Sequence, residues 1–227
     1  MYYYYYSNYG LILLALIISL GAQALISINY SKYKKIKNKK GITGAEVARE
    51  ILSKNGLDNV YVVETGGRLS DHYDPKRKTV RLSSDIYNGD TIAAIAVASH
   101  ECGHALQDKE GYFFLRMRAA LVPFVNFSSY AGYLAVVIGI FFSIINLIWV
   151  GIILECVILL FQLITLPVEF NASKRALRKI EEYNLVDNEE HRGAKKMLTA
   201  AAMTYVASVA SAVLQILRLV LIARDRD

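Results

Sequence analysis

Three long stretches with few or no charges dominate the pattern of hydrophobic and polar positions along the 227-residue chain. Residues 10–28 carry no charge and are long enough to cross a bilayer as a helix. Residues 119–168 carry a single charge, and one helix of that length would measure about 75 Å, more than twice a ~30 Å hydrocarbon core. We therefore expect a transmembrane hairpin, with spans near 124–146 and 150–168 and a turn at 146–151.

The third stretch, residues 199–217, is rich in Ala, uncharged and followed by Arg218. It suits either a membrane span or a helix lying against the other spans, and we favour a span. Together with the hairpin and the span at 10–28, this predicts about four transmembrane helices.

Composition and charge support a membrane protein. Hydrophobic residues make up 54% of the chain, and its mean hydropathy is positive. The net charge of +6 does not indicate a nucleic-acid partner, because six lysines between residues 32 and 40 directly follow the first span. The positive-inside rule places these lysines, and the basic residues that follow position 173, in the cytoplasm. The two cysteines lie in apolar surroundings and do not suggest a disulfide framework.

A His-Glu-x-x-His motif occupies residues 100–104. It lies within an apolar segment, 91–107, for which we predict a helix capped by Asp90 or Thr91. Residues four apart share one helix face, so both imidazoles can bind one Zn²⁺. Glu101 lies close enough to act as general base on water, which is the zincin arrangement. The alternative is a helix with two surface histidines, but the apolar flanks argue for burial.

The segment before this motif contains sequence patterns typical of one helix and of several strands. Residues 43–46 form a capping-box pattern that opens a helix through about Asn55. We predict strands at residues 60–64 and 79–83. We also predict that residues 68–84 form a hairpin, which turns at Asp74-Pro75. We further hypothesise that strand 79–83 offers a free edge to an extended peptide.

Several residues are candidates for the third zinc ligand and for the group that stabilises the oxyanion or contacts the substrate. Glu169 follows the hairpin and is a candidate third ligand, although an ion-pair residue at a membrane boundary is equally consistent. His72 suits a third ligand, an oxyanion-stabilising group, or a turn histidine bonded to a neighbouring aspartate. His191 and Tyr205 are further oxyanion or substrate-contact candidates.

The predicted fold is a mainly α membrane protein with a small α+β, zincin-like portion. Its expected segments are an N-terminal anchor (1–28), a cytoplasmic portion with the motif (29–118), a transmembrane hairpin (119–168), a helical segment with the third ligand (169–198) and a C-terminal helix that spans or packs against the membrane (199–227).

Five separated motifs, at residues 40–48, 70–75, 99–107, 166–173 and 200–207, resemble the YugP-like bacterial neutral zinc metallopeptidases. The resemblance implies a membrane-bound zinc peptidase, distantly similar to HtpX-type and CAAX prenyl proteases. Their Glu-x-x-Ala-Asp pattern maps onto Glu169, Ala172 and Ser173, which implies Glu169 as the third ligand. Ser173 replaces the relatives' Asp, and a hydroxyl orients a metal-binding histidine more weakly than a carboxylate.

The expected activity is zinc-dependent endopeptidase cleavage at the cytoplasmic face of the cell membrane, with one Zn²⁺ ion. The expected partners are a peptide or protein substrate and the lipid bilayer. Two alternatives stay open: a non-catalytic protein whose structural zinc is closed by a fourth ligand such as His72, and a membrane scaffold without metal.

Overall fold

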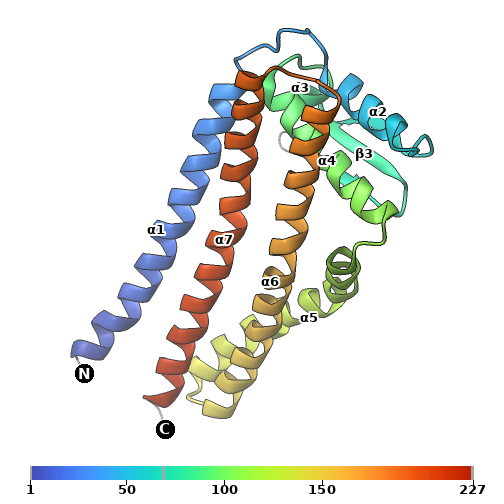
Figure 1. Ribbon diagram of the computed structural model, residues 1–227. Helices are drawn as coiled ribbons and strands as arrows, with labels where there is room; N and C mark the ends of the chain where they lie inside the picture. Colours follow the sequence, from blue (N-terminus) through green and yellow to red (C-terminus); the bar gives the residue numbers. More distant parts are fainter. Residues whose placement is uncertain (1, 68–69, 226–227) are drawn as a thin grey trace. The chain divides into compact units, whose positions relative to one another are not determined.

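The computed structural model describes the backbone of residues 2–67 and 70–225, with side chains from residue 9 onward. Within these residues the elements follow in the order α1 (Tyr2–Tyr33), α2 (Gly44–Lys54), β1 (Tyr61–Thr65), β2 (His72–Asp74), β3 (Thr79–Ser83), α3 (Ser84–Tyr87), α4 (Ile92–Lys109), α5 (Phe113–Phe141), α6 (Ile145–Glu182) and α7 (Asn188–Arg224) (Figure 1). The chain is mainly helical with one small sheet, as predicted.

The chain divides into two compact units. The all-helical unit comprises Met1–Gln23, Arg116–Pro167 and Met203–Asp227, and the mixed unit comprises Ala24–Leu115 and Val168–Ala202. Helices α1, α5, α6 and α7 each contribute residues to both units.

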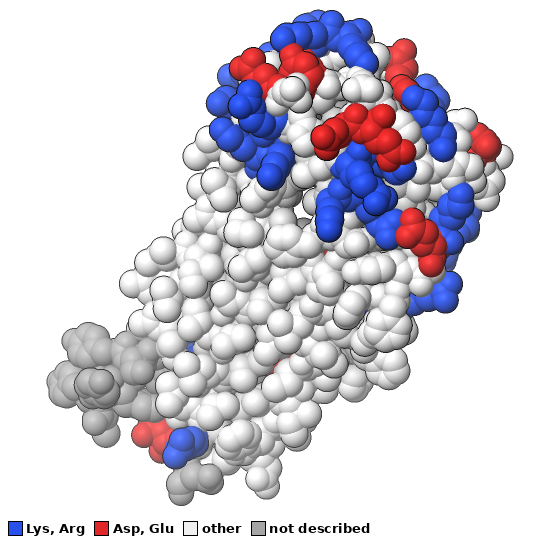
Figure 2. Space-filling view, viewed as in Figure 1, with Lys and Arg blue, Asp and Glu red and all other residues white. Residues whose placement is uncertain are grey.

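Among the residues that the structure describes, four helices are long and apolar enough to cross a membrane: α1 from Tyr9, α5, α6 and α7. Their number agrees with the four spans expected from the sequence. On the face shown in Figure 2, most charged side chains gather over elements of the mixed unit, whereas the long apolar parts of the helices present uncharged side chains.

The turn between α5 and α6 lies at residues 142–144, so the predicted turn at 146–151 is wrong. Ser143 adopts the left-handed backbone region that this tight turn requires, with φ of 56°. Gly151, the last residue of the predicted turn, instead lies inside α6, where a Cβ atom would come 2.4 Å from the Val136 side chain. This glycine allows α5 and α6 to pack closely against each other. The residues next to it in the sequence do not indicate this packing.

The sheet of the mixed unit has the order β1-β3-β2, with β1 parallel and β2 antiparallel to β3. Val80 and Leu82 of β3 are fully buried. Because β3 is paired on both sides, it offers no free edge, and the hypothesis that a peptide adds to it is wrong. The free edges belong to β1 and β2.

Helix α2 begins with the predicted capping box. The Thr43 side chain accepts a hydrogen bond from the Glu46 backbone, and the Glu46 carboxylate accepts one from the Thr43 backbone. Its buried face joins a core cluster that also contains the buried alanines of α4 and residues of α6 and α7. The core of the mixed unit therefore surrounds α4.

Helices α4 and α6 approach each other closely at Gly103. A Cβ atom at this position would lie 2.5 Å from the carbonyl oxygen of Ala172, a backbone atom that cannot turn away. The absence of a side chain at Gly103 therefore sets the distance between the two helices.

We predict that Gly103→Ala lowers the free energy of unfolding by about 1–3 kcal/mol, because the added methyl group forces the helices apart. Thermal unfolding of the full chain in detergent measures this effect. Gly66→Ala is the control, since nothing lies within 4 Å of its added Cβ. Equal stability of the two variants would contradict the close packing.

Candidate metal centre

Helix α4 holds His100 and His104 on one face inside the mixed unit. The Thr91 side chain caps the helix start by accepting a hydrogen bond from the Ala94 backbone. His104 is 9% exposed and Glu101 is 7% exposed, so both polar side chains are buried. Buried polar groups of this kind require partners.

Glu169 of α6 supplies the partner for both histidines. Its Oε2 atom lies 3.2 Å from Nε2 of His100 and 3.6 Å from Nε2 of His104, and its side chain is 3% exposed. One ligand atom from each of the three residues lies within 4.8 Å of the other two. The structure thus brings together the three side chains that the sequence and the resemblance selected.

The opposite nitrogen of each imidazole contacts a different polar group. Nδ1 of His104 donates to Oε1 of Gln107 at 3.0 Å, and Nδ1 of His100 lies 3.2 Å from Oγ of Ser173. Both Nε2 atoms are therefore turned toward Glu169. Hydrogen bonds to Nδ1 fix the tautomer and the ring orientation of a metal-binding histidine.

Gln107 is the residue at this site that sequence reasoning missed. Its side chain is fully buried, and its amide nitrogen donates to the Val168 carbonyl at 2.7 Å and to Oδ1 of Asn171 at 3.0 Å. These two bonds orient the amide oxygen toward His104. Its position three residues after His104, on the same helix face, was the available signal.

The electrostatics of the site favour a cation. Burial by itself lowers the pKa of His104, but the Glu169 carboxylate and the charge of Glu101 outweigh it and raise this pKa above its ordinary value. Two imidazole nitrogens and one carboxylate oxygen are also the donor set of catalytic zinc sites. The residues present therefore fit Zn²⁺, and among the described residues the cluster contains no fourth His, Cys, Asp or Glu.

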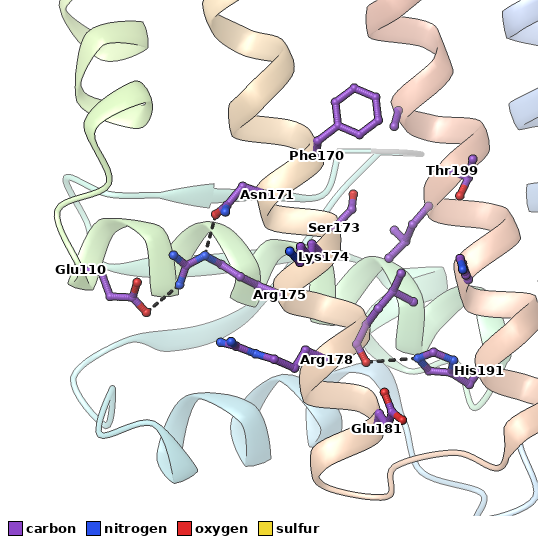
Figure 3. Close-up of a pocket in the computed structure, with 14 residues that line it drawn as sticks. Glu110, Phe170, Asn171, Ser173, Lys174, Arg175, Arg178, Glu181, His191 and Thr199 are labelled. Atoms are coloured by element: carbon purple, nitrogen blue, oxygen red, sulfur yellow. Dashed lines mark hydrogen bonds and ion pairs between the residues drawn. The ribbon is translucent and has the colours of Figure 1, made fainter.

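A chain of hydrogen bonds continues from Gln107 to the surface through Asn171, Arg175 and Glu110. Figure 3 shows the last three of these residues. Oδ1 of Asn171 also accepts from Nε of Arg175 at 2.6 Å, and Nη1 of Arg175 donates to Glu110 at 2.6 Å. This bond from Arg175 lowers the pKa of Glu110. The network ties α6 to the end of α4 and keeps Gln107 in place.

A hollow of about 810 Å³ lies beside this network, between the ends of α6 and α7 that belong to the mixed unit. Ser173 is among its lining residues, whereas His100, His104 and Glu169 are not. The hollow thus reaches the site on the Nδ1 side of His100.

Among the described residues, His72 and His191 are not members of the three-residue cluster. His72 is exposed on the edge strand β2, with Nδ1 2.7 Å from the Ser70 carbonyl oxygen. His191 lines the hollow, where its Nε2 atom lies 3.2 Å from the carbonyl oxygen of Leu177 (Figure 3). Tyr205 belongs to the all-helical unit. The roles of these three residues stay predictions.

Both cysteines are free thiols. Cys102 is fully buried on α4, and this burial raises its pKa. Its position agrees with a packing role.

Comparison with known proteins assigns the chain to a family. Residues 8–224 match the family model described as "Putative neutral zinc metallopeptidase". The chain is 48% identical over 208 residues to the "Putative membrane protease YugP" of Bacillus subtilis (strain 168), which covers 92% of each chain. No solved structure matches. The match over nearly the whole length shows that this chain belongs to the neutral zinc metallopeptidase family and that its family's metal is zinc.

Proposed function

We propose that this protein is a membrane-bound endopeptidase that hydrolyses peptide bonds with one Zn²⁺ held by His100, His104 and Glu169. The convergence of two imidazole Nε2 atoms and one carboxylate oxygen, buried where α4 meets α6, carries this proposal. The relative from Bacillus subtilis is itself named a membrane protease, which supports the same class of reaction.

Zinc bound at such a site supplies a Lewis acid that polarises a peptide carbonyl and lowers the pKa of water to about 7. Glu101 then acts as general base: its carboxylate accepts the proton of the attacking water and delivers it to the leaving amine. Gln107 and Ser173 hold the two imidazoles by their Nδ1 atoms. His72, His191 and Tyr205 remain the candidates for stabilising the oxyanion.

A structural zinc site is the alternative. Structural sites are closed by four protein ligands, whereas catalytic sites keep a position for water. The cluster contains three ligand residues among the described part of the chain, and His72 is not one of them. This number of ligands favours catalysis.

We also propose that the site faces the cytoplasm. The lysines after the first span and the basic residues in the second half of α6 belong to the same unit as the three candidate ligands. Positively charged residues next to spans are retained on the cytoplasmic side. The substrate would then be cleaved at the inner face of the membrane.

Replacement of Glu101 by Gln is expected to lower peptide cleavage about 10²–10⁴-fold, because the amide cannot accept the proton. Zinc content should be unchanged, since Glu101 is not a ligand. Mass spectrometry compares the peptide products of membranes with wild-type and variant protein, and elemental analysis measures the zinc.

Glu64→Gln is the matched control for this variant, because Glu64 lies exposed on β1, outside the cluster. Full activity of Glu101→Gln would refute the role assigned to this carboxylate, and loss of zinc would make Glu101 a ligand instead.

The orientation of the site relative to the membrane is tested with two variants, each of which adds one cysteine to a Cys156→Ser background. Lys76→Cys lies on the exposed β2–β3 turn of the mixed unit, and Ser143→Cys lies on the exposed α5–α6 turn. A membrane-impermeant maleimide added to intact cells should label Ser143→Cys and should label Lys76→Cys only after permeabilisation. The reverse pattern would place the site outside the cell.

A further inference from the structure

A second groove of the mixed unit lies between the last turns of α1 and the first turns of α7. It has a volume of about 500 Å³, and its lining includes Leu25 and Asn29 from α1 and Arg192, Lys195 and Lys196 from α7. The three candidate zinc ligands are not part of it. It is therefore a separate site with one apolar wall and one cationic wall.

The three cations of this groove have no anionic partner among the described residues. Arg192, Lys195 and Lys196 are exposed, and no ion pair or hydrogen bond of their side chains occurs there. Two other basic residues nearby do have anionic partners, since Lys37 pairs with Asp90 at 2.8 Å and Lys39 pairs with Asp187.

Two of the three nearby acidic residues, Asp187 and Glu190, have partners elsewhere in the chain. Glu190 accepts hydrogen bonds from the backbone of Lys39 and of Asp187, and Asp187 pairs with the Lys39 side chain. Glu189 lines the adjoining hollow together with Arg192 and Lys196, yet it forms no ion pair with them.

Positive charge is concentrated on this part of α7. The three cations lie in the second and third turns of the helix, after Glu189 and Glu190 of its first turn. One group of Lys and Arg side chains in Figure 2 lies over the ends of α1 and α7 that belong to this unit. The groove therefore has an unbalanced positive charge that attracts an external anion.

The groove also lies at the boundary between polar and apolar sequence on both helices. On α1 the uncharged run ends at Ser31, two residues after Asn29, and on α7 the uncharged run begins at Met197, directly after Lys196. Leu25 is 43% exposed although it is apolar. A ligand that fits this boundary has an anionic head and an apolar body.

We propose that this groove binds an anionic phospholipid, with the phosphate between Arg192, Lys195 and Lys196 and the acyl chains along the exposed apolar side of α1 near Leu25. Basic pockets between membrane helices on the cytoplasmic side are suited to anionic headgroups. The lipid neutralises these three cations and bridges α7 to α1. Binding does not depend on the peptidase reaction, so the two proposals fail independently.

The test is a binding titration of the purified full chain in neutral detergent, followed by native mass spectrometry. Phosphatidylglycerol and phosphatidylcholine are titrated separately, and glycerol 3-phosphate is added as a soluble competitor. Wild-type protein should retain phosphatidylglycerol in preference to phosphatidylcholine, and the competitor should not displace it.

Three variants locate the site. R192Q/K195Q/K196Q should raise the Kd for phosphatidylglycerol at least about tenfold. R77Q/K54Q/K76Q removes the same number of Arg and Lys charges from exposed positions outside the groove and should leave the Kd unchanged. R192K/K195R/K196R keeps the charges and should retain binding, which separates loss of charge from loss of folding.

Equal retention of the two lipids, or equal weakening by the two Gln triple variants, would overturn the proposal. Displacement of phosphatidylglycerol by glycerol 3-phosphate would also overturn it and would identify the site as one for a soluble phosphate.

Discussion

The close contact of α4 with α6 at Gly103 is the constraint on which the rest of the structure depends. Only a residue without a side chain allows the Ala172 carbonyl to approach α4 this closely. Three residues before Ala172, one turn of the helix, α6 carries Glu169, so the same approach brings this carboxylate to the two imidazoles. A packing feature at one glycine thus sets the geometry of the candidate zinc site.

The site is stabilised as a network rather than as three isolated ligands. Gln107 connects His104 to the α6 backbone and to Asn171, and Arg175 extends this connection to Glu110. A buried polar network is stable when all its members are satisfied, because an unpaired group loses its hydration without compensation. The rings are therefore oriented before a metal arrives, which favours tight binding with little rearrangement.

Local rules predicted a large part of the fold. The capping box of α2, the Thr91 cap of α4 and the bounds of β3 follow from short sequence signals, and each occurs where it was expected. Apolar runs likewise predicted four candidate spans, because their length relative to a bilayer needs no knowledge of tertiary contacts.

Features that depend on distant parts of the chain were missed. The central position of β3 requires pairing with both β1 and β2, and periodicity along one strand cannot show which neighbours it has. Gly151 was placed in the predicted turn, but it packs against α5 inside α6. Gln107 was missed because its spacing from His104 is a weak signal by itself, and its other partners belong to α6, far along the chain. The residues alone did not decide whether Glu169 lies close to His100 and His104. Only the family resemblance predicted it.

X-ray absorption at the zinc edge tests the central claim most directly, in the purified full chain and in Glu169→Ala with Glu64→Ala as control. The wild type and the control should show two imidazole nitrogens and a carboxylate oxygen at about 2.0–2.2 Å from zinc. Glu169→Ala should bind zinc much more weakly and should lose the carboxylate. A sulfur ligand at about 2.3 Å, or full zinc content with an unchanged spectrum in Glu169→Ala, would contradict the account.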